Sequence, residues 1–337
     1  MTTRAASPWS QQKERGSPLL ARFMIWLTLR LGWSVGRALL LPITLYFVIM
    51  AAGPRAASRR YLRRVLARSP TWLEVFRHFH VFASVILERV LLLNGQYYRF
   101  DFNLIGLEHL KALVEQGRGC VLLGAHLGSF EALRAIGTYA PVSVRALMYR
   151  RNLGRFTDIL ERLNPALAGE IIEIGTPNAM LEARDCVDRG EFIGILADRA
   201  PDGMPHGQKF IRTSFLGAPA SFPVGPMILA GAVGAPTLLC FGVRTGKCRY
   251  TIRFEPFADP LVIRREQRQP DLAQWVGRFA ARLEAEARAH PFNWFNFYDF
   301  WKEPADAATA TPDPDRARAR APLEPALVVS RDGVHDC

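Results

Sequence analysis

One histidine in this 337-residue sequence stands where it could act as a base. His126 follows the apolar run CVLLGA and precedes Gly128, Ser129 and a helical pattern, and Glu131 completes an H-x-x-x-x-E spacing. A carboxylate in the first turn of a helix could fold back onto the imidazole, fix its tautomer and leave the other ring nitrogen to take a proton from a hydroxyl. The pattern predicts His126 as a general base and Glu131 as its orienting acid.

The backbone around this pair could also bind an anion. Free N–H groups near Gly128 and Ser129 could stabilise a thioester oxyanion or a phosphate. Ser129 is not set in G-x-S-x-G, so we expect it to cap the helix and not to act as a nucleophile. The H-x-x-x-x-E spacing alone is close to chance. The evidence for a site comes from the position of His126 at the carboxyl end of a predicted strand, where α/β sheets carry their active sites.

The elements that must position these residues alternate along the chain. Short apolar runs predict strands at residues 119–125, 142–148, 171–174, 192–197, 236–243 and 249–254. Helical patterns lie around and between them, at residues 71–95, 107–116, 129–137, 153–163, 178–189, 220–232 and 267–288. This alternation predicts an α/β fold with a mixed, mostly parallel central sheet flanked by helices.

The N-terminal part has a different composition. Residues 1–18 are polar and are expected to be disordered, and residues 19–54 are mostly apolar and predict a membrane anchor. The longest uncharged run, residues 38–54, is at the lower limit for crossing a bilayer. A tilted spanning helix and a shallow helical hairpin both fit this length. A buried helix of a soluble protein is the alternative.

The positive charge is concentrated next to that apolar segment. The whole chain carries a net charge of +12, and residues 1–68 hold twelve Lys or Arg against one acid, Glu14. Residues 55–68 place arginines on one side of a helix and apolar residues on the other, which predicts a basic amphipathic helix on an anionic membrane surface. Such localised charge indicates lipid head groups as the partner and no nucleic acid.

The remaining composition narrows the chemistry further. The five cysteines form no C-x-x-C and no cluster with histidine, so neither a metal site nor a disulfide framework is expected. Cys120 and Cys240 lie in apolar runs and predict buried thiols. Residues 55–302 predict one ordered domain, and residues 303–337, rich in Ala, Pro, Asp and Arg, predict a disordered tail.

The order of several motifs resembles a known family. GAHLGSFE is followed by LMYRRN, GILADRAP and FLGAPASFPVGPMILA, after the apolar N-terminal segment. Over residues 20–302 the sequence is similar to the bacterial lipid A biosynthesis acyltransferases of the lysophospholipid acyltransferase superfamily. The resemblance implies a fold like that of glycerol-3-phosphate acyltransferase. It also implies an O-acyltransferase on the cytoplasmic face of the bacterial inner membrane.

The resemblance also implies partners and further site residues. Acyl carrier protein or coenzyme A would donate the acyl group to a membrane lipid, with no metal or other cofactor. Arg150 would help to bind acceptor phosphate or donor, with a surface cation as the alternative and Arg151 beside it. Asp198 would be an acid near the site, with a strand-end cap as the alternative. Arg199 stands where the family commonly has an uncharged residue, so acceptor contacts are expected to differ.

The last part of the domain, HPFNWFNFYDFW, departs from the lipid A enzymes and looks more like acyltransferases of aryl polyene and related pigment-lipid pathways. Its seven Phe, Tyr and Trp residues could sit at the membrane interface, line an acyl tunnel or close the core.

Two other functions stay open: a thioesterase or lipid hydrolase, with water as acceptor, and a non-catalytic membrane lipid carrier or scaffold.

Overall fold

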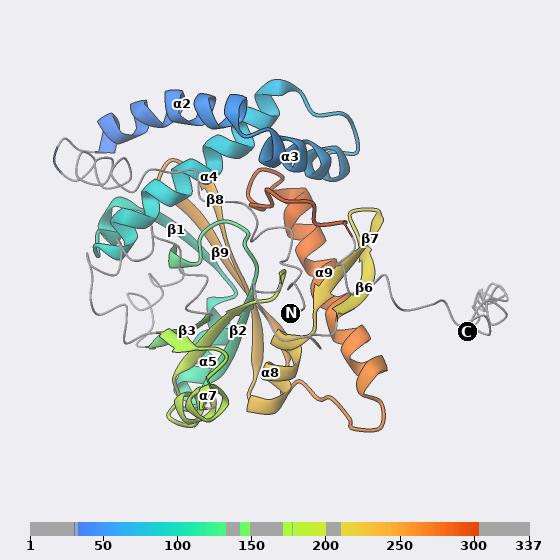
Figure 1. Ribbon diagram of the computed structural model, residues 1–337. Coiled ribbons are helices and arrows are strands. Elements are labelled where there is room, and N and C mark those ends of the chain that lie inside the picture. Colours follow the sequence, from blue (N-terminus) through green and yellow to red (C-terminus); the bar gives the residue numbers. More distant parts are fainter. Residues whose placement is uncertain are drawn as a thin grey trace, which may run out of the picture. The chain divides into compact units, whose positions relative to one another are not determined.

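A seven-stranded sheet forms the centre of the computed structural model, which describes Arg30 and residues 33–132, 142–148, 171–176, 178–199 and 210–302. The strand order is β1-β9-β8-β2-β5-β3-β4, and every neighbouring pair is parallel except β8 with β9. The prediction of a mixed, mostly parallel α/β sheet is confirmed (Figure 1). The strands are β1 Asp101–Ile105, β2 Cys120–Gly124, β3 Val144–Met148, β4 Ile171–Glu173, β5 Phe192–Leu196, β8 Thr237–Gly246 and β9 Arg249–Ala258.

The side chains of β2 show how the sheet builds a core on each face. All five residues of the strand are buried, and they alternate between two apolar clusters because successive strand residues point to opposite faces. Val121 and Leu123 join the cluster that contains α7 (Ala179–Asp188), α8 (Gly225–Val233) and α9 (Arg268–Ala289). Cys120 and Leu122 join the cluster that contains α5 (Leu107–Glu115) and part of α4 (Trp72–Leu93). Helices therefore flank both faces.

The predicted elements mostly match the described ones, but β1 was not predicted and one predicted helix is partly wrong. Residues 220–232 were expected to be one helix, but Ala218–Pro223 form β7, which pairs antiparallel with β6 (Phe210–Phe215). Leu216 and Gly217, both with positive φ, make the tight turn between them, and α8 starts only at Gly225. Pro219 and Pro223 are tolerated because β7 pairs only with β6, and Pro226 lies in the first turn of the helix that follows. Residues 133–141 and 149–170, which include most of two predicted helices, lie outside the described residues.

The helices α2 (Trp33–Met50) and α3 (Ala52–Val65) lie at the top of Figure 1. α2 contains Pro42, and α3 follows it after a single residue. Within the described part of the chain, no single helix is long and apolar enough to cross a membrane. Val35–Met50 and Ala52–Val65, bent by 94°, meet that test only as a pair, by length and composition.

The apolar side of α3 packs against the protein. Tyr61 and Leu62 are fully buried, and the Tyr61 ring lies 5.1 Å from the Trp294 ring, measured between centroids. The apolar side of residues 55–68 is therefore covered by the protein itself, and contact of this helix with an anionic membrane surface stays a prediction. Only its arginine side faces outward, because the tertiary fold supplies an apolar partner for the other side. The chain divides at Lys302 into two units, and residues 303–337 lie outside the described residues.

Candidate active site

The ends of two neighbouring strands bring His126 and Asp198 together. β2 and β5 are parallel, and their register pairs Gly124 with Leu196. The Ala197 N–H donates to the Gly124 carbonyl at 2.9 Å, so the pairing continues past the strand ends. Two residues further along each strand stand His126 and Asp198. Their proximity follows from the register of a buried parallel pair, whose carboxyl ends meet at one edge of the sheet.

The contacts between the two side chains define an imidazole–carboxylate pair. His126 Nδ1 lies 2.8 Å from Asp198 Oδ1, and the His126 backbone N–H donates to the same oxygen at 3.1 Å. The Trp294 indole donates to Asp198 Oδ2 at 3.0 Å. Because an ionised carboxylate only accepts hydrogen bonds, Nδ1 carries the proton and Nε2 is left as the basic nitrogen. The His126 side chain is 38% exposed, whereas Asp198 is completely buried.

The charges around the pair set its protonation state. Burial by itself would raise the pKa of Asp198, but the His126 imidazole, the Arg199 guanidinium and the hydrogen bonds from His126 and Trp294 hold it well below its usual range. Desolvation lowers the pKa of His126, and Arg199 acts in the same direction, while Asp198 and Glu131 oppose both. At neutral pH the site therefore holds a neutral imidazole beside an ionised carboxylate, the state that a general base requires.

Glu131 lies close to this pair but has other partners. Its Oε1 forms an ion pair with Arg89 Nε of α4 at 2.7 Å, and its Oε2 accepts a hydrogen bond from Ser129 Oγ at 3.3 Å. The expected placement of Glu131 against the imidazole is corrected in this respect: among the described contacts, Asp198 occupies the Nδ1 side of His126. Ser129 Oγ also accepts from the Ala132 N–H at 3.3 Å, the type of contact expected of a helix cap.

The backbone amides that were expected to bind an anion are already occupied. Gly128 N–H donates to the Asn293 carbonyl at 2.9 Å, and Ser129 N–H donates to the Gly242 carbonyl at 2.8 Å. Gly128 has φ +73°, and a Cβ atom there would lie 2.0 Å from the Gly242 oxygen, so only glycine fits. Gly128 and Ser129 thus attach the segment after His126 to β8 and to the loop at residue 293. In this arrangement neither amide is available as an oxyanion donor.

Of the two arginines in the predicted site, only Arg199 is described. Its Nη2 lies 3.5 Å from Asp198 Oδ2 and donates to the Phe295 carbonyl at 3.2 Å, and its guanidinium lies over the Tyr298 ring. The side chain is 14% exposed. Arg199 is therefore part of the wall of the site behind Asp198. Arg150 lies outside the described residues.

The aromatic segment near the end of the domain supplies supports that the sequence reading missed. Leu127 and Trp294 form an antiparallel bridge, and the Phe295 N–H donates to the His126 carbonyl at 3.0 Å. Trp294 and Asn296 are completely buried. Of the three expectations for this segment, closure of the core describes these residues. Part of the signal was present in the sequence, since buried asparagine and indole N–H groups need partners, and Asn293 and Trp294 find theirs in the Arg244 backbone and in Asp198.

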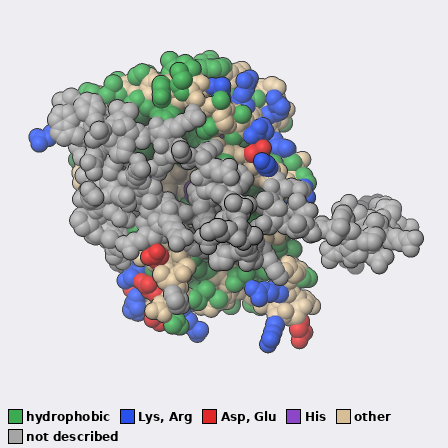
Figure 2. Space-filling model, in the orientation of Figure 1, with side chains coloured by type: hydrophobic (Ala, Val, Ile, Leu, Met, Phe, Trp, Pro, Cys, Tyr) green, Lys and Arg blue, Asp and Glu red, His purple; other side chains and the backbone are tan. Residues whose placement is uncertain are grey.

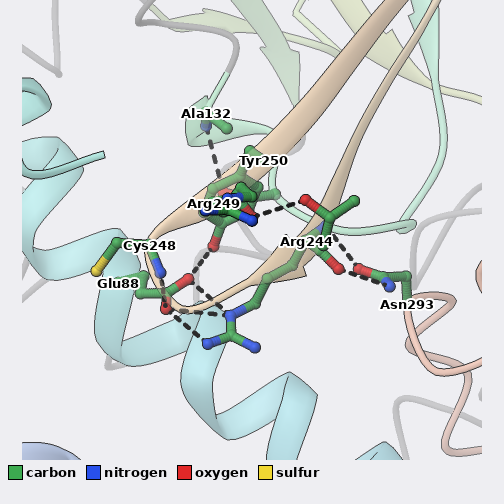
Figure 3. A network of polar contacts seen from close by, with 9 residues as sticks. Glu88, Ala132, Arg244, Cys248, Arg249, Tyr250 and Asn293 are labelled. Carbon is green, nitrogen blue, oxygen red and sulfur yellow. Dashed lines mark hydrogen bonds and ion pairs between the residues drawn. The ribbon is translucent and has the colours of Figure 1, made fainter. Parts of the chain in front are cut away.

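A second buried carboxylate, Glu88 of α4, lies at the centre of a separate network (Figure 3). Glu88 is fully buried and makes three hydrogen bonds with the Arg244 guanidinium of β8, at 2.9, 2.9 and 3.1 Å. The Tyr250 hydroxyl of β9 and the Cys248 N–H also donate to it. The Arg244 backbone exchanges two hydrogen bonds with the Asn293 side chain, at 2.8 and 3.1 Å. The network fixes α4 and the β8–β9 hairpin relative to the loop at Asn293, whose carbonyl accepts a hydrogen bond from Gly128.

An imidazole at the carboxyl end of a central strand, held by a carboxylate from the next strand, is an arrangement that can activate a hydroxyl or water. The family comparison makes this chemistry more specific. Residues 18–303 match the family model described as bacterial lipid A biosynthesis acyltransferase, and the chain belongs to this family. The protein is an acyltransferase, as the motif order suggested. The comparison with curated proteins found no match.

Proposed function

We propose that this protein transfers a fatty acyl group from acyl carrier protein, or from coenzyme A, to a hydroxyl of a membrane lipid or glycolipid. The observation that carries the proposal is the His126–Asp198 pair, with a 2.8 Å hydrogen bond on Nδ1 and a partly exposed imidazole, in a chain of the lipid A acyltransferase family. This geometry suits removal of a proton from an acceptor hydroxyl by Nε2.

The transfer is a direct sequential one. His126 Nε2 takes the acceptor proton as the oxygen attacks the thioester carbonyl, and the imidazolium is stabilised by Asp198. When the tetrahedral intermediate collapses, the carbon–sulfur bond breaks and the thiolate receives the proton from Nε2. No acyl-enzyme forms. Glu131 supports the imidazolium through its negative charge near the ring, and Ser129 acts only as a cap.

A cation is the candidate for stabilising the oxyanion, because the Gly128 and Ser129 amides have backbone partners. Arg150, two residues beyond the last residue of β3, is our proposed contact for donor or acceptor phosphate, on the basis of its place in LMYRRN. Arg199 contributes positive charge behind Asp198.

We also propose that the N-terminal helices hold the enzyme at the cytoplasmic face of the bacterial inner membrane. Leu41, Leu45, Tyr46, Ile49 and Met50 of α2 are each 42–57% exposed. Exposed apolar side chains at this density on one helix are typical of a surface that contacts lipid. The 94° bend between α2 and α3 favours a shallow attachment through α2 over one straight spanning helix.

The test is acyl transfer by purified protein from acyl carrier protein thioester to extracted membrane lipid, followed by mass spectrometry. His126→Ala is expected to abolish transfer while the protein stays folded. Near-wild-type transfer by that variant, or an acyl group trapped on Ser129, would contradict the scheme. Fatty-acid release without a lipid acceptor would instead indicate a thioesterase. Lipid binding without turnover would indicate a carrier.

The acceptor can be identified by lipid profiling of cells with and without the intact gene. The lipid that loses one acyl chain names both the acceptor and the chain length. Loss from lipid A supports the family's usual acceptor. Loss from an aryl polyene lipid supports the alternative suggested by HPFNWFNFYDFW.

A further inference from the structure

A pocket with a cavity volume of about 640 Å³ lies on the outward side of α3 and just beyond its end. Three arginines of α3 and one from the turn that follows it line the pocket, together with residues from the β6–β7 turn and the end of the domain. The lining residues used below are Arg60, Arg63, Arg64, Arg68, Asp299 and Trp301.

The positive charge of this pocket exceeds the negative charge around it. Arg60 pairs with Asp299 at 3.3 Å, and Arg68 pairs with Glu74. The Arg64 guanidinium lies 4.7 Å from the centre of the Trp301 ring. Arg63 is exposed and has no carboxylate partner among the described residues. Four guanidinium groups therefore face two carboxylates, and the excess charge suits an anion with several acceptor oxygens.

The surroundings of the pocket indicate where that anion comes from. Arg55, in the first turn of α3, donates to the Val48 and Ile49 carbonyls, so the basic helix is tied to the end of α2. Figure 2 shows the apolar side chains over α2 next to the basic side chains over α3 along one edge of the molecule. An apolar surface beside guanidinium groups matches the acyl and head-group layers of a leaflet.

We propose that this pocket binds the phosphate of an anionic phospholipid head group while the exposed side of α2 contacts the acyl layer. The inference rests on the proposed membrane association and adds a discrete lipid site to it. The pocket also lies near the proposed active site. The Trp301 ring lies 6.2 Å from the Trp294 ring, and Trp294 donates to Asp198. A lipid held there places the His126–Asp198 pair close to the membrane surface from which an acceptor arrives.

The matched variants are Arg63→Gln and Arg59→Gln. Both arginines are exposed and lie one turn apart on α3, and each substitution removes one positive charge. Only Arg63 lines the pocket. Cosedimentation of the full chain with phosphatidylcholine vesicles containing phosphatidylglycerol measures binding without any acyl donor. Arg63→Gln is expected to weaken binding about fivefold, and Arg59→Gln by about twofold or less. Inorganic phosphate should compete more strongly than sodium chloride of equal ionic strength.

Equal losses in the two variants, or no excess effect of phosphate over chloride, would show a diffuse basic surface and overturn the proposal. So would an Arg63→Gln variant that binds acyl carrier protein more weakly but binds the vesicles like the wild type, because the pocket would then serve the protein donor. Acyl transfer by the wild type in detergent micelles tests the proposed function separately, so the two failures can be told apart.

Discussion

Asp198 and Glu88 are both completely buried carboxylates, yet their surroundings differ in the way that matters for chemistry. Asp198 binds an imidazole that is 38% exposed and has a second nitrogen able to accept a proton. Glu88 binds a guanidinium that is 12% exposed, a tyrosine hydroxyl and a backbone N–H, all of which only donate to it. A buried charge is thus no sign of catalysis by itself. The partner decides whether the charge can act on a substrate.

The protonation of the partners supports the same distinction. Burial by itself would lower the pKa of Arg244, but the hydrogen bonds and charge of Glu88 raise it. Burial raises the pKa of Tyr250 well above its usual value, and Glu88 adds to this. Neither group titrates near neutral pH. The pKa of His126 is held below its usual value, so at neutral pH its Nε2 is unprotonated and can accept a proton, whereas the Arg244 guanidinium and the Tyr250 hydroxyl stay protonated.

The first prediction concerns the reactive pair and has the largest expected effect. His126→Ala should lower the rate of acyl transfer by about 10³-fold or more, because the only proposed base is lost. The melting temperature should change little, since the side chain is partly exposed. Transfer assays and thermal unfolding of one preparation measure both. A His126→Ala variant with a clearly lower melting temperature would show a structural role for His126. The contrast between the His126–Asp198 pair and the Glu88–Arg244 network would then not hold.

The second prediction concerns the structural network. Glu88→Gln should lower the free energy of unfolding by about 3–5 kcal/mol, because Arg244 is left buried without its counter-charge. The double variant Glu88→Gln/Arg244→Gln should recover part of this loss. Chemical denaturation measures it. A stable Glu88→Gln protein with greatly reduced transfer would instead give Glu88 a role in the reaction.

The third prediction separates the two acids near His126. Asp198→Asn should reduce transfer by about 10²-fold or more, because the amide cannot stabilise the imidazolium. Glu131→Gln should reduce transfer less, because the described contacts of the Glu131 carboxylate are with Arg89 and Ser129 and not with the imidazole. Comparison of kcat for the two variants shows which of the two acids orients His126. A larger loss for Glu131→Gln would restore the H-x-x-x-x-E acid as the orienting group.

The fourth prediction is a shift in pH dependence. His126 must be neutral to act as a base, so kcat/KM should fall as the pH drops through its pKa. Because the site lowers that pKa, the midpoint should lie below 6.5. Asp198 raises the pKa of His126, so Asp198→Asn should move the midpoint further down. An unchanged midpoint in that variant would mean that another group controls the acid limb.

Local patterns were enough to predict much of the sheet. The apolar runs that became β2, β5 and β8 could be read directly, because parallel strands covered on both faces are apolar throughout. Residues 220–223 of β7 were read as part of a helix and β6 was not predicted, since the choice between strand and helix there depends on the pairing of these two segments with each other. β1 was missed for a similar reason: it is a short strand at the edge of the sheet with only partly buried residues, and pairing with β9 defines it.

The sequence by itself indicated His126 as the candidate base, because it follows a buried apolar run at the end of a strand. It also determined the family, through the order of its motifs. Only the tertiary structure decided which acid orients that base. Glu131 is five residues from His126 and Asp198 is 72 residues away, but the register of β2 and β5 brings Asp198 to 2.8 Å. Spacing along the chain reports local contacts, whereas the partners of a strand end depend on which strand folds beside it.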